Sequence, residues 1–447
     1  MDFTRYLPVE IVQKILIFFK PAELARFSLC CVQWREVSNL DALWLHFCIE
    51  RGWLRFGLMK NCIDLINQET LYPMHTNISG LSPQFSLNVP SDTRLSSICK
   101  WKNIFIRVLH LNTNWKTGRY TVASIRRGHL EKVSAMDCND NCIVSGSEDK
   151  RLQVWDIKTC TCTRRIMVHS DTVTAVKLRG NMIVTGCADS SIRIIDSTSG
   201  KMKHSFQGHS GSVDHIVLIG DMVVSAGSDR TVRVWSLTEK RLKHVLRKHT
   251  DEIECLCSYG NCVVSGSWDK SLILWNIDSG KLIHQYSGHG EVVTCCQFDD
   301  QKVVSGSADG LLRIWTVDSD ECSRVLYGHE GEVYCLVYNR FVIASGCSDS
   351  TVIIWSHQGD RLHVLKEHLG IVRCLHINEE RLVSGGDQKK IVVWDYRKGE
   401  AMHVLHRHPT LLHLMWKGDK TCSRVLGPKI HTSCLAVEKT AIWEVPA

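Results

Sequence analysis

A histidine followed twenty residues later by an aspartate recurs along most of the sequence. One example lies in the stretch GHSGSVDHIVLIGDMVVSAGSDRTVRVWS, which begins at Gly208 and contains His209 and Asp229. A histidine oriented by a carboxylate is the general base of many hydrolases, so this pair has the side chains of an acid–base site. The same two side chains can also satisfy each other's polar atoms inside a folded core.

The number of copies decides between these roles. The histidines are His129, His169, His209, His249, His289, His329 and His368; the aspartates are Asp149, Asp189, Asp229, Asp269, Asp309 and Asp349; and a tryptophan closes six copies at Trp155, Trp235, Trp275, Trp315, Trp355 and Trp394. Seven catalytic centres in one chain are implausible, whereas seven structural copies are expected of a repeat protein. The sequence also lacks a Gly-x-Ser-x-Gly motif and a phosphate-binding loop, so we predict that the chain is not an enzyme.

Each repeat is predicted to form four short strands. NCIVSGS, DMVVSAGS and QKVVSGS are β-branched runs, while RLQVW, TVRVW and LLRIW alternate apolar and polar residues. The aspartate between them begins a tight turn. Four strands in about forty residues are typical of one β-propeller blade.

The unit Gly-His…Ser-Gly-Ser-x-Asp…Trp-Asp resembles the WD40 repeat. The resemblance implies a buried hydrogen-bonded set in which a Ser or Thr joins the His, Asp and Trp. These hydroxyl residues are Ser145, Thr185, Ser225, Ser265, Ser305, Ser345 and Ser384. Ile195 replaces the tryptophan of copy two, and copy seven has Gln388 in register with the aspartate and Asp387 one place early. We therefore expect a weaker polar set in copy seven.

The ring is predicted to have eight blades. The segment after Trp394 contains four strand-like runs with a poor signature, and RYTVASIRRG before His129 supplies a strand that pairs with the C-terminal one. Residues 119–447 are long enough for eight blades of about forty residues. A seven-bladed ring with a C-terminal extension is the alternative. The fold class is thus mainly β, preceded by a small helical region.

The N-terminal region is predicted to be helical. Leu7, Ile11, Ile15 and Phe18 or Phe19 recur at helical spacing. Pro8 suits a first turn, and Pro21 opens a second helix. WREVSN and ALWLHFCIERG follow as a third helix. Residues 57–91 are polar and irregular, which is typical of a loop.

This region resembles an F-box, which implies a surface for a Skp-type adaptor. The residues at motif positions are Leu7, Pro8, Ile11, Ile15, Leu24, Leu29, Val32, Trp34, Leu43 and Trp44. WKNIFIRVLHLNTNWKTGRY resembles the helical stalk that leads into the propeller of F-box/WD-repeat proteins. The predicted domains are an F-box at 3–50, a linker with a helical stalk at 51–118 and a WD40 propeller at 119–447.

The resemblance implies a substrate-recognition subunit of an SCF (Skp–cullin–F-box) ubiquitin ligase. Its partners would be the adaptor, the cullin–RING core and a protein substrate that is then degraded by the proteasome. The alternative is a WD40 scaffold whose F-box serves assembly without degradation. Whether the substrate must be phosphorylated is left open by the sequence.

Substrate contacts in such propellers lie five residues after each histidine and just before each aspartate. The candidates at these positions are Trp268, Tyr334, Arg373, Glu148, Asp214 and Glu254. Arginines at these positions would pair with phosphate, but only Arg373 is present, and the acidic residues would repel a phosphate. Lys150, Arg230 and Lys270 follow the aspartates and are expected to be solvated turn charges.

Composition limits the other partners. The net charge of +7 is mild for 447 residues, and no basic run is long enough to follow a nucleic acid. Glu10, Gln13 and Lys14 interrupt the apolar N-terminus, which excludes a signal peptide or membrane span. The 21 cysteines include no C-x-x-C, so we expect reduced thiols in the cytoplasm or nucleus.

No cofactor or metal is predicted. A histidine cluster lies near the C-terminus, at His403, His406, His408 and His413. Residues 403 and 406 face opposite sides of a strand, and no Cys or carboxylate lies at ligand spacing.

Overall fold

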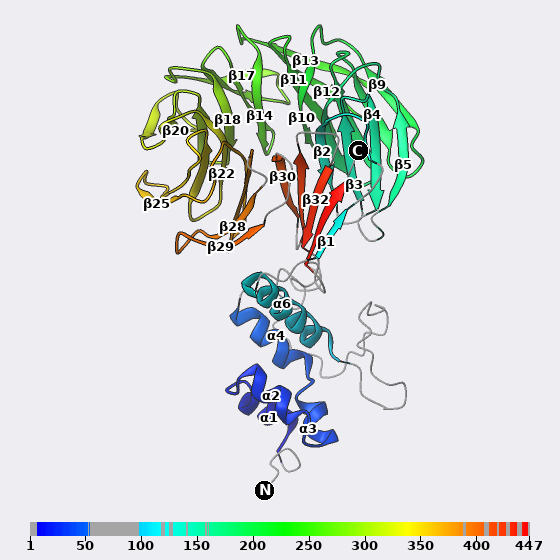
Figure 1. The fold of residues 1–447 in the computed structure, drawn as a ribbon, viewed down its shortest axis with the longest axis vertical. Coiled ribbons are helices and arrows are strands. Elements are labelled where there is room, and N and C mark those ends of the chain that lie inside the picture. Colours follow the sequence, from blue (N-terminus) through cyan, green and yellow to red (C-terminus); the bar gives the residue numbers. More distant parts are fainter. Residues whose placement is uncertain are drawn as a thin grey trace. The chain divides into compact units, whose positions relative to one another are not determined.

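A computed structural model shows two compact units, residues 1–117 and 118–447 (Figure 1). It describes residues 7–51, 53, 98–117, 121–124, 128–139, 142–156, 159, 161–387 and 390–405, together with the strands at 411–417, 420–425, 430–435 and 440–445. The predicted loop at 57–91, Gln388, His406 and His408 lie outside this part. No helix in the described ranges is long and apolar enough to cross a membrane.

The N-terminal unit contains five described helices. They are α1 (Val9–Leu16), α2 (Pro21–Phe27), α3 (Val32–Val37), α4 (Asp41–Glu50) and α6 (Lys100–Thr117). Pro21 is the first residue of α2, as predicted, while Pro8 lies one residue before α1. The single helix predicted from WREVSN onward is wrong: Ser38–Leu40 separates α3 from α4. The Ser38 carbonyl accepts the indole N–H of Trp44 at 2.7 Å, so the break itself is tied to the next helix.

One apolar core joins these helices. Trp101 and Phe105 of α6 are buried with Trp44 and Phe47 of α4, and the rings of Trp44 and Phe105 lie 5.1 Å apart edge to face. The backbone N–H of Trp101 also donates to Asp41 at 2.9 Å. The helix predicted as a stalk therefore belongs to the same compact unit as the F-box helices.

Seven antiparallel four-stranded sheets make up most of the second unit, and we call them blades 1 to 7. Blade 1 is β2 (Val133–Cys138), β3 (Cys142–Ser147), β4 (Arg151–Asp156) and β5 (Cys162–Met167); blade 2 is β6 (Val173–Arg179), β7 (Met182–Cys187), β8 (Ile192–Asp196) and β9 (Met202–Phe206); blade 3 is β10 (Val213–Ile219), β11 (Met222–Gly227), β12 (Thr231–Ser236) and β13 (Arg241–Arg247); blade 4 is β14 (Ile253–Tyr259), β15 (Cys262–Ser267), β16 (Ser271–Asn276) and β17 (Lys281–Ser287). Blade 5 is β18 (Val293–Phe298), β19 (Lys302–Ser307), β20 (Leu312–Thr316) and β21 (Cys322–Leu326); blade 6 is β22 (Val333–Tyr338), β23 (Ile343–Cys347), β24 (Val352–Trp355) and β25 (Arg361–Leu365); blade 7 is β26 (Val372–Ile377), β27 (Leu382–Gly386), β28 (Ile391–Asp395) and β29 (Glu400–Leu405).

The remaining strands complete the ring. They are β1 (Thr121–Ser124), β30 (Leu411–Lys417), β31 (Lys420–Val425), β32 (Ile430–Leu435) and β33 (Thr440–Val445). The first strand of each blade contacts the first strand of the next, β30 contacts β26, and β31 contacts β2. β1 pairs with β33 in parallel, so the two ends of the unit meet in one sheet, as predicted. These strands occupy the position of the predicted eighth blade.

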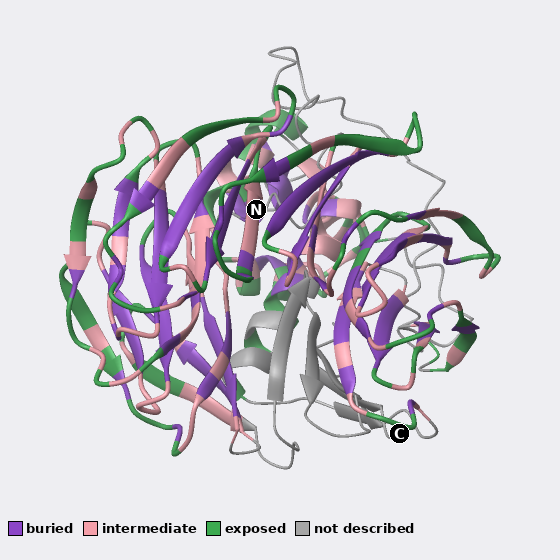
Figure 2. Ribbon diagram, turned by 90° about the horizontal axis from the view of Figure 1, so that it is seen from above, coloured by how far each residue is buried: buried purple, intermediate pink, exposed green. Residues whose placement is uncertain are grey.

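Apolar clusters fill the space between neighbouring blades. Trp235, Trp275, Trp315, Trp355 and Trp394 are each buried between their own blade and the preceding one. Ile195 takes this place between blades 1 and 2. The burial colours of Figure 2 show the same pattern, with buried residues inside the sheets and exposed ones on outer strands and turns.

Candidate functional site

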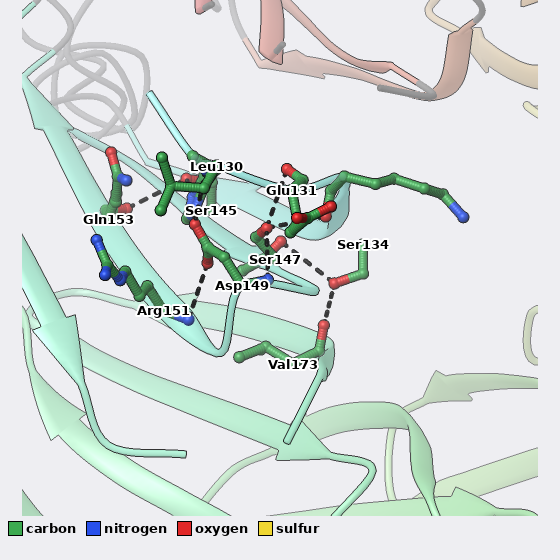
Figure 3. A network of polar contacts seen from close by, with 12 residues as sticks. Leu130, Glu131, Ser134, Ser145, Ser147, Asp149, Arg151, Gln153 and Val173 are labelled. Carbon is green, nitrogen blue, oxygen red and sulfur yellow. Dashed lines mark hydrogen bonds and ion pairs between the residues drawn. The ribbon is translucent and has the colours of Figure 1, made fainter. Parts of the chain in front are cut away.

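The repeated polar residues form closed hydrogen-bonded sets. In blade 1, His129 Nδ1 donates to Asp149 at 2.9 Å, and His129 Nε2 lies 2.8 Å from the Ser145 hydroxyl. Trp155 Nε1 donates to the same hydroxyl oxygen at 2.9 Å. Because an indole only donates and a carboxylate only accepts, all three bonds run in one direction. Trp155 donates to Ser145, Ser145 to His129, and His129 to Asp149. Figure 3 shows the surrounding contacts of Ser145, Ser147 and Asp149.

Blades 3, 4, 5 and 6 contain the same set, centred on His209, His249, His289 and His329. Burial raises the pKa of the Asp349 carboxyl, but hydrogen bonds from Thr351 and the Glu330 backbone outweigh this and lower that pKa to about 2. Burial lowers the pKa of His329, so this imidazole stays neutral. Both imidazole nitrogens are occupied and the ring is buried, so neither nitrogen is available to a substrate. The sets are therefore structural, as predicted.

Blade 2 has an incomplete set. His169 Nε2 bonds to Thr185 at 2.7 Å, but Nδ1 is 3.9 Å from Asp189 and has no hydrogen-bond partner among the described residues. Arg193 lies 3.2 Å from Asp189 instead. Burial, and secondarily the charge of Arg193, lowers the pKa of His169 to about 4. In the sequence, the only sign that this blade differs is Ile195 in place of the tryptophan.

Blade 7 is also incomplete, as its register predicted. His368 Nε2 and the Trp394 indole each lie 2.7 Å from the Ser384 hydroxyl. His368 Nδ1 has no hydrogen-bond partner in the described chain, and burial lowers the pKa of this histidine to about 4. Asp387 points elsewhere and pairs with Arg373.

Two His–Cys–Asp groups have the spacing of metal ligands, and neither was predicted from the sequence. They are His169, Cys187, Asp189 and His329, Cys347, Asp349. In the second group the histidine nitrogen is already bonded to the aspartate, and in the first Arg193 brings a positive charge to the carboxylate. Both groups are therefore explained as variants of the structural set with a cysteine beside it.

In each blade the first strand begins, and the second strand ends, at the same edge of the propeller. We call this edge the turn face. Lys150, Arg230 and Lys270 lie there in left-handed backbone with φ of 66°, 62° and 68°. They are exposed residues of turns, as expected, and they also have a role that was not predicted. Each donates to a backbone carbonyl of the next blade, at Ser170, Thr250 and Gly290 respectively. These three cations tie neighbouring blades together.

Hydroxyls five residues after the histidine also link blades. Ser134, Thr174 and Thr294 donate to the carbonyls of Val173, Val213 and Val333 in the following blade. Figure 3 shows the bond between Ser134 and Val173. A carboxylate cannot donate this bond, so Asp214 and Glu254 at the same position in blades 3 and 4 have a different role.

The predicted substrate residues fall into separate groups. Trp268 is 49% exposed and its indole N–H donates to Glu254 at 2.9 Å. Arg373 stacks 4.7 Å above the ring of Tyr334 and forms two bonds to Asp387, at 3.1 and 3.2 Å.

The two remaining acidic candidates also have partners. Glu148 pairs with Lys132 at 3.2 Å, and Asp214 accepts a hydrogen bond from the Ser212 hydroxyl at 2.6 Å. Substrate contact by the six candidates stays a prediction. Asp387, which forms an ion pair with Arg373, was not predicted as part of this site. Its position one residue before the usual aspartate was the signal in the sequence that could have indicated a different role.

The predicted adaptor residues divide by burial. Leu24, Leu43 and Trp44 are buried in the helical core, so their assignment to the adaptor surface is corrected to a supporting role. Ile15 and Trp34 are half-buried. The exposed members are Leu7, Pro8, Ile11, Leu29 and Val32. Phe18 is 89% exposed and was not among the candidates, although it lies at the end of the predicted apolar stripe.

The ring of sheets and its buried sets define the class: a WD-repeat propeller protein with an N-terminal helical unit. The family model "WD domain, G-beta repeat" matches residues 121–156, 160–196, 200–236, 240–276, 280–316, 320–356 and 359–395, and the model "F-box-like" matches residues 4–50. The chain belongs to the F-box/WD-repeat family.

Several relatives carry names from one kind of complex. "Probable E3 ubiquitin ligase complex SCF subunit sconB" of Arthroderma benhamiae is 28% identical over 163 residues, which cover 36% of this chain and 24% of the relative. "Probable E3 ubiquitin ligase complex SCF subunit scon-2" of Neurospora crassa is 22% identical over 209 residues, covering 37% and 32%. The chain thus matches about a quarter to a third of the length of these relatives. The solved structure of a computationally designed protein, Ika8, has a TM-score of 0.65 and 28% identity over 69% of this chain and 97% of its own.

Proposed function

We propose that the protein is the substrate receptor of an SCF-type ubiquitin ligase in the cytoplasm or nucleus. The helical unit would bind a Skp-type adaptor and through it the cullin–RING core. The propeller would hold a protein substrate for ubiquitination and proteasomal degradation. The names of the relatives support this assembly.

The observation that carries the proposal is the exposed apolar surface of the helical unit. Leu29 and Val32, on either side of the break between α2 and α3, are 79% and 65% exposed. Burial of such side chains would stabilise a complex by about 1.5–3 kcal/mol each. A small unit that leaves several large apolar side chains in water has the surface of a protein-binding domain.

The contribution of such a receptor to the reaction is proximity. A substrate held on the propeller brings its lysines to a conjugating enzyme bound elsewhere in the complex, which raises their effective concentration. The receptor itself would form no covalent bond.

The test is co-purification of the adaptor with a Leu29→Ser/Val32→Ser variant of the full chain. We expect the adaptor to be lost while the thermal unfolding curve is unchanged, because neither side chain belongs to the core. Met167→Ser, at a 72% exposed position of β5, is the control for removing surface apolar area and should retain the adaptor. Adaptor recovery at the wild-type level in the double variant would refute the docking surface.

The second measurement is degradation. Depletion of the protein should lengthen the half-lives of its bound partners when the adaptor is present. Unchanged half-lives of all bound partners, with the adaptor still bound, would favour a scaffold without degradative function.

A further inference from the structure

On the turn face, the position five residues after the motif histidine carries different side chains in different blades. In blades 1, 2 and 5 the residue five after the histidine is a hydroxyl that bonds to the next blade. In blades 3 and 4 this residue is Asp214 or Glu254, which cannot form that bond. The ring closes without it at these two positions, so the two carboxylates are not required for the contact between blades.

Asp214 and Glu254 act on the same neighbour. Asp214 is the second residue of β10 (Val213–Ile219) and Glu254 the second residue of β14 (Ile253–Tyr259), and these two first strands of neighbouring blades contact each other. Burial lowers the pKa of His215, the residue after Asp214, while the charges of both carboxylates raise it. Lys177 of β6 is the one cation of the described chain that also acts on His215. Among the charges that act on His215, two carboxylates thus outnumber one lysine.

Four other cations of the turn face already have partners. Lys132 pairs with Glu148 at 3.2 Å, and Lys150 and Arg230 donate to backbone carbonyls of the next blade. Lys270 also donates to a carbonyl and lies 3.4 Å from Glu291. Among the described residues, none of these four cations forms an ion pair with Asp214 or Glu254.

Arg373 is engaged as well, which bears on phosphate recognition. Two of its N–H groups, on Nε and Nη2, donate to the Asp387 carboxylate, and the guanidinium covers the Tyr334 ring. The bond to Asp387, more than any other influence, raises the pKa of Arg373 further. A phosphate bound to Arg373 would meet the negative charge of Asp387, so Asp387 opposes recognition of a phosphorylated substrate by this arginine.

Trp268 adds a large aromatic surface beside the carboxylates. Its indole N–H is held by Glu254 at 2.9 Å, and about half of the side chain remains exposed. An indole face attracts ammonium and guanidinium groups, and tryptophan is common among residues that dominate binding energy. Asp214, Glu254 and Trp268 thus combine negative charge with a surface for an alkyl stem or a guanidinium plane.

We propose that Asp214, Glu254 and Trp268 bind a lysine or arginine side chain of the substrate, so that the receptor recognises a basic, unphosphorylated degron. This inference rests on the proposed function and names its substrate class. The bound cation would lie between the carboxylates, with its stem or guanidinium plane on the indole.

The experiment is selection from a random peptide library displayed against the purified full chain in complex with the adaptor. We expect the selected peptides to be enriched in Lys and Arg and depleted of Asp and Glu. The best peptide should bind an Asp214→Asn/Glu254→Gln variant at least about tenfold more weakly, which corresponds to about 1.4 kcal/mol. These replacements keep the side-chain shapes and an oxygen that accepts the Trp268 N–H.

The control variant, Glu131→Gln/Glu330→Gln, removes two exposed carboxylates from other loops of the same face. It should retain the affinity, which separates a local site from a general loss of negative charge. Trp268→Ala should weaken binding of the same peptide. A library with phosphoserine at fixed positions forms a second arm of the selection.

Preference for acidic or phosphoserine peptides would overturn the inference, as would equal affinity for the wild type and the Asp214→Asn/Glu254→Gln variant. These outcomes do not affect the ligase proposal, which depends on the adaptor and on partner half-lives. Conversely, basic peptides that bind a chain unable to retain the adaptor would support this site and refute the ligase role.

Discussion

The two units of this protein use their motif residues in different ways. In the propeller, the motif residues His, Asp, Ser and Trp are buried and bonded mainly to one another, as in the set around His209. In the helical unit, Trp44 and Leu43 form the core, while Leu29 and Val32 of the same motif face solvent. A motif whose side chains bond to one another indicates a fold. A motif that leaves large apolar side chains exposed also indicates a binding partner.

The comparison also indicates where specificity resides. The repeats are alike at their buried sets and differ on the turn face, where Asp214 and Glu254 replace hydroxyls and Arg373 pairs with Asp387. Positions that the fold does not require are free to vary with the ligand. In the propeller, the residues that identify the family are therefore distinct from those expected to select the substrate.

The largest expected effect is in the helical core. Trp44→Ala removes a buried ring that packs on Phe47 and Phe105 and donates to Ser38, and should cost about 3–5 kcal/mol. Hydrogen exchange of α4 and α6 measures this loss in the full chain. Phe18→Ala, at an exposed position, should change stability by less than about 0.5 kcal/mol. Equal protection in the two variants would contradict the division between core and surface.

An intermediate effect is expected within the repeated sets. His209→Ala breaks bonds to Asp229 and Ser225 and should cost about 1–3 kcal/mol. His169→Ala should cost less, because it removes a buried nitrogen that has no partner in the described chain. Urea unfolding of both variants gives the comparison. A cost at His169 as large as at His209 would show that the aspartate bond adds little.

The smallest expected effect is a pH dependence from the incomplete sets. Folding lowers the pKa of His169 and His368 from 6.5 to about 4, so between these values the unfolded chain binds protons that the folded chain does not. Stability contributed by these neutral histidines is thus present above pH 6.5 and lost as the pH falls toward 4.

A His169→Gln/His368→Gln variant tests this dependence. Its urea midpoint should fall less steeply between pH 6.5 and 4 than that of the wild type. The lowered pKa of Asp349, about 2, adds a further loss only at lower pH, as the pH falls below the ordinary aspartate value of 3.8. Parallel wild-type and variant curves would contradict the assignment.

Much of the fold could be predicted from the sequence, and the errors share a cause. The spacing of His129 and its equivalents predicted the blades and their polar sets because each set lies within one repeat. The merging of α3 with α4 was wrong, and the bond from the exposed Lys150 to the Ser170 carbonyl of the next blade was not predicted. Hydrophobic periodicity contains neither this bond nor the one from the Trp44 indole to the Ser38 carbonyl, because both are polar contacts of single side chains.

The sequence by itself determined the repeat, the position of each buried set and the boundary between helical and β regions. Local patterns suffice for these features, because strand alternation and motif spacing act within about forty residues. The tertiary structure decided which motif residues are exposed, that Asp387 occupies Arg373, and that Asp214, Glu254 and Trp268 gather in blades 3 and 4. These features depend on contacts between strands and between blades, and a one-dimensional pattern does not contain the distances on which charge pairing and burial depend.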